Sequence, residues 1–592
     1  MLKLGARRRS TKISTLICVF ALGCANAVAQ NAATSHRGHT VAPKYRELPS
    51  PLKMDGLGKS SLKITTTSTN AQAYFNQGLR LLHCFWEFEA YRAFKEAARL
   101  DPSAPMAYWG IAEALGNIQS MKEERTAALD KAKSLMPKAS EHEQYYLRAQ
   151  AAMADDKDEK AKAAYRREME TLVDRYPDDL DAQAFLALSE MGGYDQDGRP
   201  REGAIYSQAI LRNILTSDPD NAAANHYWIH AVEGSSHPEE ALHSADILGR
   251  LVPNSGHMVH MPGHIYYRTG DYEKARQAFA DSARVDEGYM TAQKITPEED
   301  WNYGHNLSYL VAACAEAGRY KEGLQWAKKL EGLRSGLLLG HNNASYAIYV
   351  GSSLTRLHIR FGDWQIAASD RVEFGVDPPS ATRSAQNYQE GLSYYGNGMA
   401  ALDKSDMAQA HKAAEALDAL LWRLEAERPK PKAEGADKAN KQDKKDDDEI
   451  QDDSEGVLKV LGTASLDLRG NIESAAGQHE QAVKLLKLAE EKEKDLGYRE
   501  PPSYSRPESE SLGYAYLRAH EWQNARDAFN QELRERPKTG FATFGIAQSY
   551  ALAGQAKEAS VAYQRFLESW SHADAELPQV QQARAWLASH GQ

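Results

Sequence analysis

The sequence predicts an all-α fold in which pairs of helices repeat along the chain, and three observations predict it. Small residues, aromatic residues and prolines recur at fixed offsets in several stretches of roughly 34 residues. The composition, 42% hydrophobic and 26% charged, is ordinary for a soluble helical protein. The 592 residues exceed the usual size of one compact domain. A helical-repeat array grows by stacking, however, and needs no single central core.

The first 29 residues have the pattern of an export signal. A basic stretch precedes an apolar run at 13–22, and residues 27–29 form a small-residue cleavage site. We therefore expect a signal peptide at 1–29 and an exported, periplasmic mature chain. Cys24 leaves a membrane-anchored lipoprotein open as an alternative, although Ala21 stands where a lipidation site usually has leucine.

The expected mature chain is acidic and has one pair of cysteines. The signal would remove basic residues and no acidic one from a chain of net charge −11, and such a chain argues against a nucleic-acid partner. No second apolar run is long enough to span a membrane, so we expect no transmembrane segment in the mature chain. Cys84 and Cys314 belong to distant repeats, and we expect two buried free thiols in preference to a disulfide.

The chain then divides by composition. Residues 30–67, rich in Thr, Ser, Pro and Lys, predict a mobile lead-in. Helical repeats follow at 68–424, with a turn-rich insertion at 192–200 that would cover one end of the groove. Residues 425–455 carry many charges and few apolar side chains, which predicts a disordered linker. Residues 456–592 return to the repeat pattern and finish with a capping helix.

The clearest repeats span residues 71–102, 222–253, 256–286, 506–537 and 540–566. In the first, Gly78 and Ala90 allow two helices to approach closely, Phe94 fills the gap to the next repeat, and Pro102 ends the unit. This pattern resembles that of the tetratricopeptide repeat (TPR) superfamily over most of the mature chain. The resemblance implies a solenoid of antiparallel helix pairs with a concave groove.

Three segments resemble, more narrowly, a group of bacterial, often exported TPR-domain proteins. They read "FNQGLRLLHCFWEFEAYRAFKEAARLDPSAPMAYWGIAEALG", "NHYWIHAVEGSSHPEEAL" and "GHMVHMPGHIYYRTGDYEKA". The resemblance implies fold and compartment and supplies no reaction.

A cluster of histidines follows the repeat period. The set comprises His226, His230, Glu233, His257, His260, His264 and, in the following repeat, His305. His226 and His260 are 34 residues apart, and so are His230 and His264. Offsets of 3, 4 and 7 residues along a helix fall within about 60° of arc, so the members on each helix share a face. By their offsets within TPR repeats, all seven would line the concave groove.

Neighbouring helices pack about 8–10 Å apart, so these side chains can converge on one ion. Histidines with a carboxylate suit Zn, Cu, Ni or Fe. Solvated or hydrogen-bonded histidines are the alternative. Met258 and Met261 would favour copper if they turned inward, but their offsets favour packing. Pro262 either kinks the helix or delays its start, and a late start would leave His257 and His260 in a loop.

Other histidines and aromatics near this cluster have less specific patterns. We expect His237 and His243 on the surface. His83, Trp109 and Glu113 occupy groove offsets and would extend a binding surface, although a position in the core or at the rim is favoured for Trp109. The sequence contains no nucleophile elbow, phosphate loop or HExxH motif.

Two hypotheses about function follow. The first is an exported TPR scaffold whose groove, centred on the histidines, binds a protein segment or small ligand. The alternative is a metal-binding protein or metal-dependent enzyme. In it His226, His230, His260 and His264 hold the ion, and Glu233 is a further ligand or the base. Whether the protein is an enzyme stays open.

Overall fold

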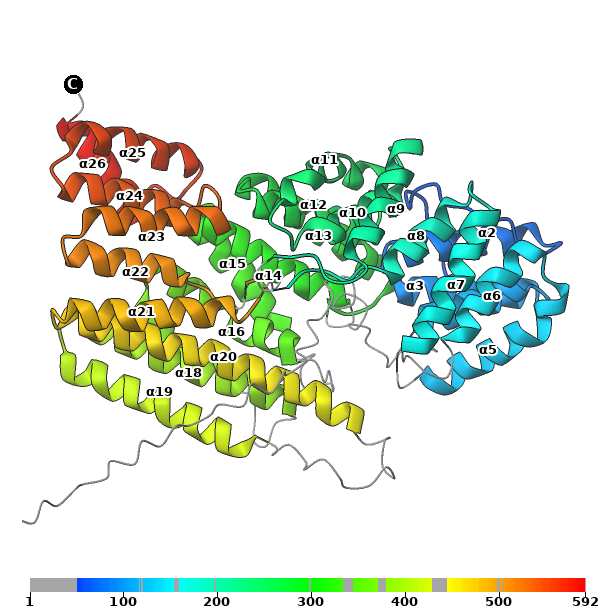
Figure 1. The fold of residues 1–592 in the computed structure, drawn as a ribbon, viewed down its shortest axis with the longest axis horizontal. Coiled ribbons are helices and arrows are strands. Elements are labelled where there is room, and N and C mark those ends of the chain that lie inside the picture. The colour runs from blue at the N-terminus through cyan, green and yellow to red at the C-terminus, as the bar shows by residue number, and fades with distance from the viewer. Residues whose placement is uncertain are drawn as a thin grey trace, which may run out of the picture. The chain divides into compact units, whose positions relative to one another are not determined.

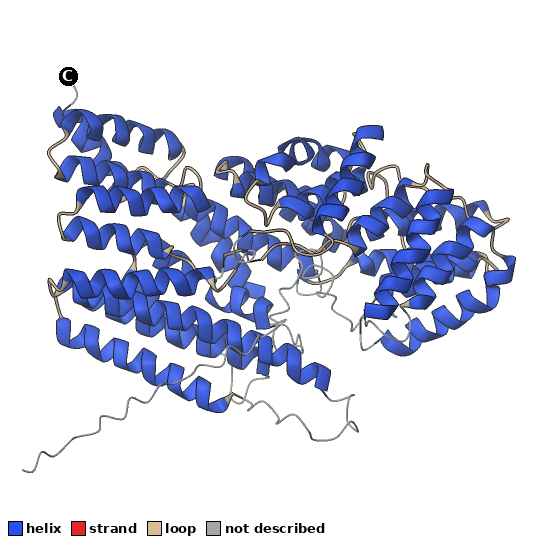
Figure 2. Ribbon diagram, viewed as in Figure 1, coloured by secondary structure: helices blue, strands red, loops and turns tan. Residues whose placement is uncertain are grey.

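A computed structural model describes residues 50–590 apart from 117, 119–120, 154–158, 196–197, 298–299, 334–343, 371–379, 429–443, 498–500 and 503. Within these residues the regular structure is helical, and the only β-type pairing is an isolated bridge between Tyr194 and Pro200 (Figure 2). The predicted all-α class is therefore confirmed. No described helix has both the length and the apolar character needed to cross a membrane.

The helices follow one another along the chain as successive pairs (Figure 1). The first part contains α2 (Thr69–His83), α3 (Glu87–Leu100), α4 (Pro105–Leu115), α5 (Lys122–Leu135), α6 (Glu141–Ala152), α7 (Glu159–Arg175), α8 (Leu180–Ser189) and α9 (Ala204–Ser217). The middle part contains α10 (Ala222–Val232), α11 (Leu242–Leu251), α12 (Gly256–Arg268), α13 (Tyr272–Gln293), α14 (Trp301–Glu316), α15 (Tyr320–Glu331), α16 (Ala344–Phe361) and α17 (Trp364–Ser369). The last part contains α18 (Ser380–Asp403), α19 (Met407–Glu427), α20 (Lys444–Ala475), α21 (His479–Lys494), α22 (Glu508–Arg518), α23 (Trp522–Glu535), α24 (Gly540–Leu552), α25 (Ala556–Ser569) and α26 (Pro578–His590).

Polar side chains begin the helices that surround the histidines. Asn221 accepts a hydrogen bond from the backbone N–H of Ala224 at the start of α10, over 2.9 Å. Asp271 and Asp300 cap α13 and α14 in the same way. Each such cap satisfies a backbone donor that the helix itself leaves unpaired and contributes about 1 kcal/mol.

Glycine and phenylalanine set the spacing of the helix pairs, as the repeat pattern predicts. The ring of Phe94 lies against both Gly78 of its own pair and Gly110 of the next. Phe279 lies against Gly263 so closely that a Cβ atom there would stand 2.3 Å from the ring. The small residues are therefore required by close packing of aromatic rings on helix backbones.

The expectation of a mobile lead-in is wrong for residues 50–67, while 30–49 lie outside the described residues. Leu57, Leu62 and Ile64 are buried in the core. The side chain of Gln77 accepts a hydrogen bond from Met54 N–H at 3.0 Å and donates one to the carbonyl of Leu52. Polar groups on α2 thus satisfy the backbone of this extended segment, which composition alone does not reveal.

The expected linker at 425–455 is only partly described. Residues 429–443 lie outside the described part of the chain, α19 ends before them at Glu427, and α20 begins after them at Lys444. Leu417 and Leu420 of α19 share one hydrophobic cluster with Val457 and Leu461 of α20. The helices on the two sides of the expected linker therefore pack together as one body. The capping helix is present as α26, which packs on α25.

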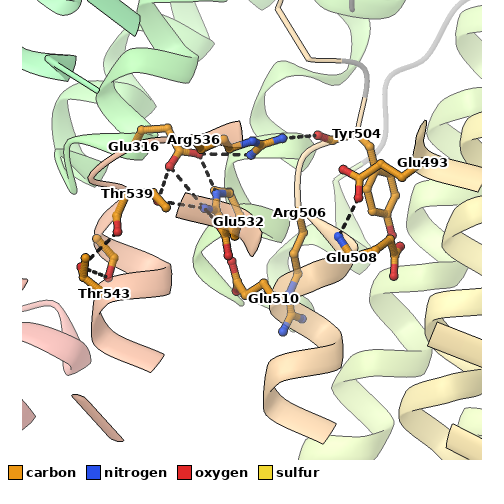
Figure 3. Close-up of polar contacts among 12 residues, drawn as sticks. Glu316, Glu493, Tyr504, Arg506, Glu508, Glu510, Glu532, Arg536, Thr539 and Thr543 are labelled. Atoms are coloured by element: carbon orange, nitrogen blue, oxygen red, sulfur yellow. Dashed lines mark hydrogen bonds and ion pairs between the residues drawn. The ribbon is translucent and has the colours of Figure 1, made fainter. Parts of the chain in front are cut away.

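A buried ionic cluster joins α14 and α16 to the repeats α22–α24 (Figure 3). The guanidinium of Arg360 donates to Glu316 at 2.9 Å and to Glu510 at 2.5 Å, and it lies 3.6 Å from the ring centroid of Phe541. The hydroxyl of Thr539 donates to Glu316 at 2.6 Å. By their repeat offsets Glu510 and Phe541 are concave positions, so the chain's own arginine occupies the concave side of these repeats.

Both cysteines of the described chain are buried and free, as expected. Burial raises the pKa of the Cys84 thiol to about 12 and also raises that of Cys314.

Candidate metal centre

Three consecutive first helices of repeats supply the histidines. Helix α10 carries His226 and His230 and is followed directly by Glu233. Helix α12 begins at Gly256 and continues through Pro262, so the interpretation that it starts late, leaving His257 and His260 in a loop, is wrong. Helix α14 carries His305 in its second turn.

Three of the histidines form a group that we call centre 1: His226, His230 and His257. The Nε2 atom of His226 lies 3.1 Å from Nε2 of His257 and 3.1 Å from Nε2 of His230. Nitrogen atoms bound to one ion at about 2.0–2.1 Å are separated by roughly 2.8–3.4 Å for bond angles between 90° and 109°. The observed distances match that spacing.

The other three form centre 2: His260, His264 and His305. The Nε2 atoms of His260 and His264 are 2.5 Å apart, and one nitrogen of each ring lies within 4.8 Å of the others. The ring centroids of His260 and His305 are 5.0 Å apart. Centre 2 repeats the arrangement of centre 1 one repeat later, but its Nε2–Nε2 distance is shorter than the spacing for two nitrogens bound to one ion. In each centre, two histidines lie on the first helix of one repeat and the third lies on the first helix of the next repeat.

The outer nitrogens of three rings determine which tautomer each of these rings adopts. The hydrogen bonds are His226 Nδ1 to the carbonyl of His83 (2.6 Å), His230 Nδ1 to Glu233 Oε1 (2.8 Å) and His260 Nδ1 to Asn306 Oδ1 (2.8 Å). Carbonyl and carboxylate oxygens only accept, so Nδ1 is the donor in these three rings. His264 Nδ1 forms an ion pair with Glu233 Oε2 at 2.9 Å. The amide of Asn306 is oriented by its own donation to the carbonyl of Phe279 at 2.8 Å.

A neutral imidazole that carries its proton on Nδ1 presents a lone pair on Nε2. His226 and His230 therefore direct two lone pairs at each other across 3.1 Å. Two lone pairs cannot form a hydrogen bond and repel each other in a buried site. A shared cation, either a metal ion or a bound proton, would remove this repulsion in centre 1.

Glu233 lies between the two centres and its carboxylate is fully buried. Its Oε1 accepts the Nδ1–H of His230, and its Oε2 forms an ion pair with His264 Nδ1 at 2.9 Å. A carboxylate beside the outer nitrogen of a histidine is typical of the groups that orient metal ligands from outside. The role of Glu233 as a further ligand or as a base stays a prediction.

The histidines are enclosed, contrary to the expectation that they line an open groove. His226, His260 and His264 are 0% exposed and His230 and His257 are 3% exposed, while His305 is half-buried. The reason is that α2 of the first repeat contacts α10, so the turn between α2 and α3 lies over the expected concave positions.

An aromatic ring covers each centre. Phe85, in the turn between α2 and α3, has its ring centroid 4.6 Å from His226, 5.4 Å from His230 and 5.8 Å from His257. Its φ of 51° is the left-handed conformation, which costs a side-chain-bearing residue on the order of 1 kcal/mol or more.

Tyr309 takes the corresponding place at centre 2, at 4.6 Å from His264, 5.7 Å from His260 and 5.6 Å from His305. The sequence analysis missed Phe85, Asn306 and Tyr309. For Tyr309 its spacing of four residues from His305 was the available signal.

Other predicted residues lie outside the two centres. His83 bonds Tyr227 and Asp181, each at 2.9 Å, and contributes only its carbonyl. Trp109 belongs to the core, and Glu113 accepts a hydrogen bond from Gln150 at 2.9 Å. Met258 and Met261 are core residues and His237 and His243 are exposed, all as expected. The insertion packs against the end of α10, where the hydroxyl of Tyr194 donates to the carbonyl of Ala231.

No protein-family model matches the sequence, and no curated protein matches it. Among solved structures, yeast Tom70 aligns at 14% identity and a TM-score of 0.30, covering 88% of this chain and 95% of that one. Cut9–Hcn1 of the APC/C hetero-tetramer aligns at 12% identity and 0.25, covering 86% and 96%. The human IFIT1 dimer with m7Gppp-AAAA aligns at 12% and 0.31, covering 79% and 90%. No ligand or partner follows from these similarities.

The helix pairs of this chain form an all-α, TPR-type helical-repeat array.

Proposed function

We propose that this protein binds two transition-metal ions, one in centre 1 and one in centre 2. The observation that carries the proposal is the group of three histidine nitrogens in each centre, with the facing Nε2 atoms of His226 and His230 oriented by acceptors on Nδ1. Such outer acceptors orient the ring and raise the basicity of the ligating nitrogen. In centre 2 the acceptor on His260 Nδ1 does the same.

The donor set indicates the class of ion. Each centre offers three imidazoles and no thiolate, which suits Zn, Cu, Ni or Fe and disfavours Mg or Ca. Met258 and Met261 are packed in the core, so no thioether adds a preference for Cu(I). The stacked rings of His257 and His260 have centroids 6.0 Å apart, which limits the distance between two bound ions to no more than about 12 Å.

The competing explanation for the same geometry is a proton in place of each metal ion. One imidazolium per facing pair would also remove the repulsion between lone pairs. It would add one positive charge per centre next to the single carboxylate of Glu233, whereas a divalent ion would add two, so the cost of burying charge does not separate the two explanations. Metal content separates the two explanations directly.

The helical-repeat fold that the scaffold hypothesis requires is present, but the histidines do not provide the binding surface that this hypothesis expects. A helical-repeat scaffold is suited to binding a peptide or protein partner. The histidines, however, are covered by the turn that holds Phe85 and are not a surface on which a protein segment can lie. A protein partner would therefore bind the array at another place, and we propose none.

The test is the metal content of the full chain, expressed without a histidine tag and measured by mass spectrometry after reconstitution with Zn(II), Cu(II), Ni(II) or Fe(II). We expect two ions per chain. The double variant His226→Ala/His230→Ala removes centre 1 and His260→Ala/His264→Ala removes centre 2, so each is expected to retain one ion. The matched control, His237→Ala/His243→Ala, changes two exposed histidines and retains two. A correctly folded chain that binds none of these ions contradicts the proposal.

We also propose that the mature protein is exported, on the basis of the sequence pattern at 1–29, which lies outside the described residues. The expected result is a mature N-terminus at Gln30 in the periplasmic fraction. Recovery in the membrane fraction with a lipid on Cys24 would support the lipoprotein alternative.

A further inference from the structure

One buried carboxylate joins the two centres. Oε1 of Glu233 accepts a hydrogen bond from His230 Nδ1 at 2.8 Å, and its Oε2 forms an ion pair with His264 Nδ1 at 2.9 Å. His230 belongs to centre 1 and His264 to centre 2. All three side chains are 0% exposed. A change of charge at either histidine therefore acts on the other through a group that solvent screens very little.

A second contact between the centres lies on α12. His257 of centre 1 and His260 of centre 2 are three residues apart on this helix, and their rings stack with centroids 6.0 Å apart. Each ion would lie about 2.0–2.1 Å from its ligating nitrogen, which limits the distance between the two ions to no more than about 12 Å. Ions bound in both centres would therefore interact directly across the protein interior.

The charge of the ions determines the sign of this interaction. Neutral imidazoles leave a divalent ion with its charge of +2, so ions in both centres repel each other. At about 12 Å this repulsion lowers affinity about tenfold even in a medium with the dielectric constant of water, about 80. The effective dielectric constant of a protein interior is lower, so the factor between two buried centres is larger.

The shared carboxylate acts in the same direction. An ion on Nε2 of His230 makes the Nδ1 proton of that ring more acidic and draws the charge of Glu233 towards it. Less of that charge then remains to orient His264 and to raise the basicity of its ligating nitrogen. Repulsion and the shared carboxylate thus both make the second ion bind more weakly.

We infer that the two centres are negatively coupled, so that a divalent ion in one lowers the affinity of the other at least about tenfold. This inference rests on the proposed function. Coupling between two binding sites is reciprocal, so the factor is the same whichever centre fills first. Over a range of free metal concentration the chain then carries one ion, and it takes up the second only when the concentration rises further. Occupancy of the second centre thus responds to metal supply while the first stays filled.

The test compares the full chain with variants that keep one centre, each titrated with Zn(II) to equilibrium against a chromophoric chelator. His226→Ala/His257→Ala removes two ligands of centre 1, and His260→Ala/His305→Ala removes two ligands of centre 2. Both variants keep the two histidines that contact Glu233, and each is expected to bind one Zn(II). The product of the two dissociation constants of the native chain is expected to exceed the product of the two variants' constants at least about tenfold.

Equal products would show that the centres are independent and would overturn the inference, as would a smaller product for the native chain. Native mass spectrometry at one Zn(II) per chain checks the sign without any variant. An excess of doubly loaded over singly loaded chains would contradict negative coupling. The matched control, His237→Ala/His243→Ala, is expected to keep both native constants. A folded chain that binds no Zn(II) would instead overturn the proposed function.

Discussion

Replacing Glu233 by glutamine tests the geometry of both centres with one substitution. The carboxylate accepts Nδ1–H from His230 at 2.8 Å and forms an ion pair with His264 Nδ1 at 2.9 Å. A glutamine of nearly the same shape has one oxygen that accepts and one NH₂ group that donates. It can therefore satisfy only one of the two histidines in its present tautomer. The other must place its proton on Nε2, which then points into its centre and can no longer bind an ion.

The expected result for Glu233→Gln is one tightly bound ion per chain in place of two. Loss of an outer-sphere acceptor alone typically weakens metal binding by about 10–100-fold, or about 1.4–2.7 kcal/mol. Glu233→Ala, which removes the acceptor without supplying a donor, is accordingly expected to weaken both centres by about that factor while two sites remain.

The assay is competition for Zn(II) against a chromophoric chelator, with affinities and stoichiometry fitted together. Asn306→Leu is the matched control, because the histidine that Asn306 bonds is His260 of centre 2, and its replacement is expected to weaken centre 2 alone. Unchanged binding of two ions by a folded Glu233→Gln variant would refute the assignment of tautomers. Equal weakening of both centres by Asn306→Leu would refute the separation into two centres.

Three further predictions concern packing, titration and thiol reactivity. Gly263→Ala places a Cβ atom 2.3 Å from the ring of Phe279. We expect this variant to have a free energy of unfolding lower by about 1–3 kcal/mol in urea titrations. The control is Gly462→Ala, which has no neighbour within 4 Å and is expected to be neutral or stabilising. Burial raises the pKa of the half-buried Glu493 from 4.5 to about 7. Between these pH values the folded chain holds a proton on Glu493 that the unfolded chain loses. This group therefore opposes folding increasingly as the pH rises from 4.5 to 7. Glu493→Gln is thus expected to be more stable than the native chain at pH 8, by on the order of 2 kcal/mol, and equal to it near pH 4; a pH-independent difference would contradict this. Cys84, with its thiol pKa raised to about 12, is expected to react with iodoacetamide at pH 8 only after unfolding; rapid labelling of the native chain would show that the site opens.

The sequence was sufficient to predict the helix pairs and to predict which histidines lie near one another. The 34-residue spacing between His226 and His260 places them at equivalent positions of adjacent repeats, and this follows from periodicity alone. Packing of Phe94 and Phe279 on glycines follows for the same reason. The helical continuation through Pro262 did not follow, because a propensity rule gives way where neighbouring helices hold the backbone in place.

What the sequence could not provide is the enclosure of the histidines. The carbonyl of His83 contacts His226 across a separation of 143 residues, and the ring of Phe85 lies beside the same histidine. No local pattern in the sequence predicts such contacts. The role of Glu233 depended on which nitrogen of each ring faces it, which a one-dimensional spacing does not specify. The burial of residues 50–67 likewise depends on partners such as Gln77 on α2, and the sequence does not specify where α2 lies relative to this segment.

The contact between the turn that holds Phe85 and helices α10 and α12 has a consequence for how this chain folds. In an open repeat array each unit touches only its neighbours, and folding can begin anywhere and spread. Here the first repeat also closes onto helices that are synthesised much later, which adds long-range contacts and slows the final step. A chain emerging from synthesis would pass through a stage in which α10 and α12 are formed and their histidines are still uncovered. Centre 1 would have to capture its ion at that stage, before the first repeat docks, and release it afterwards only through local unfolding.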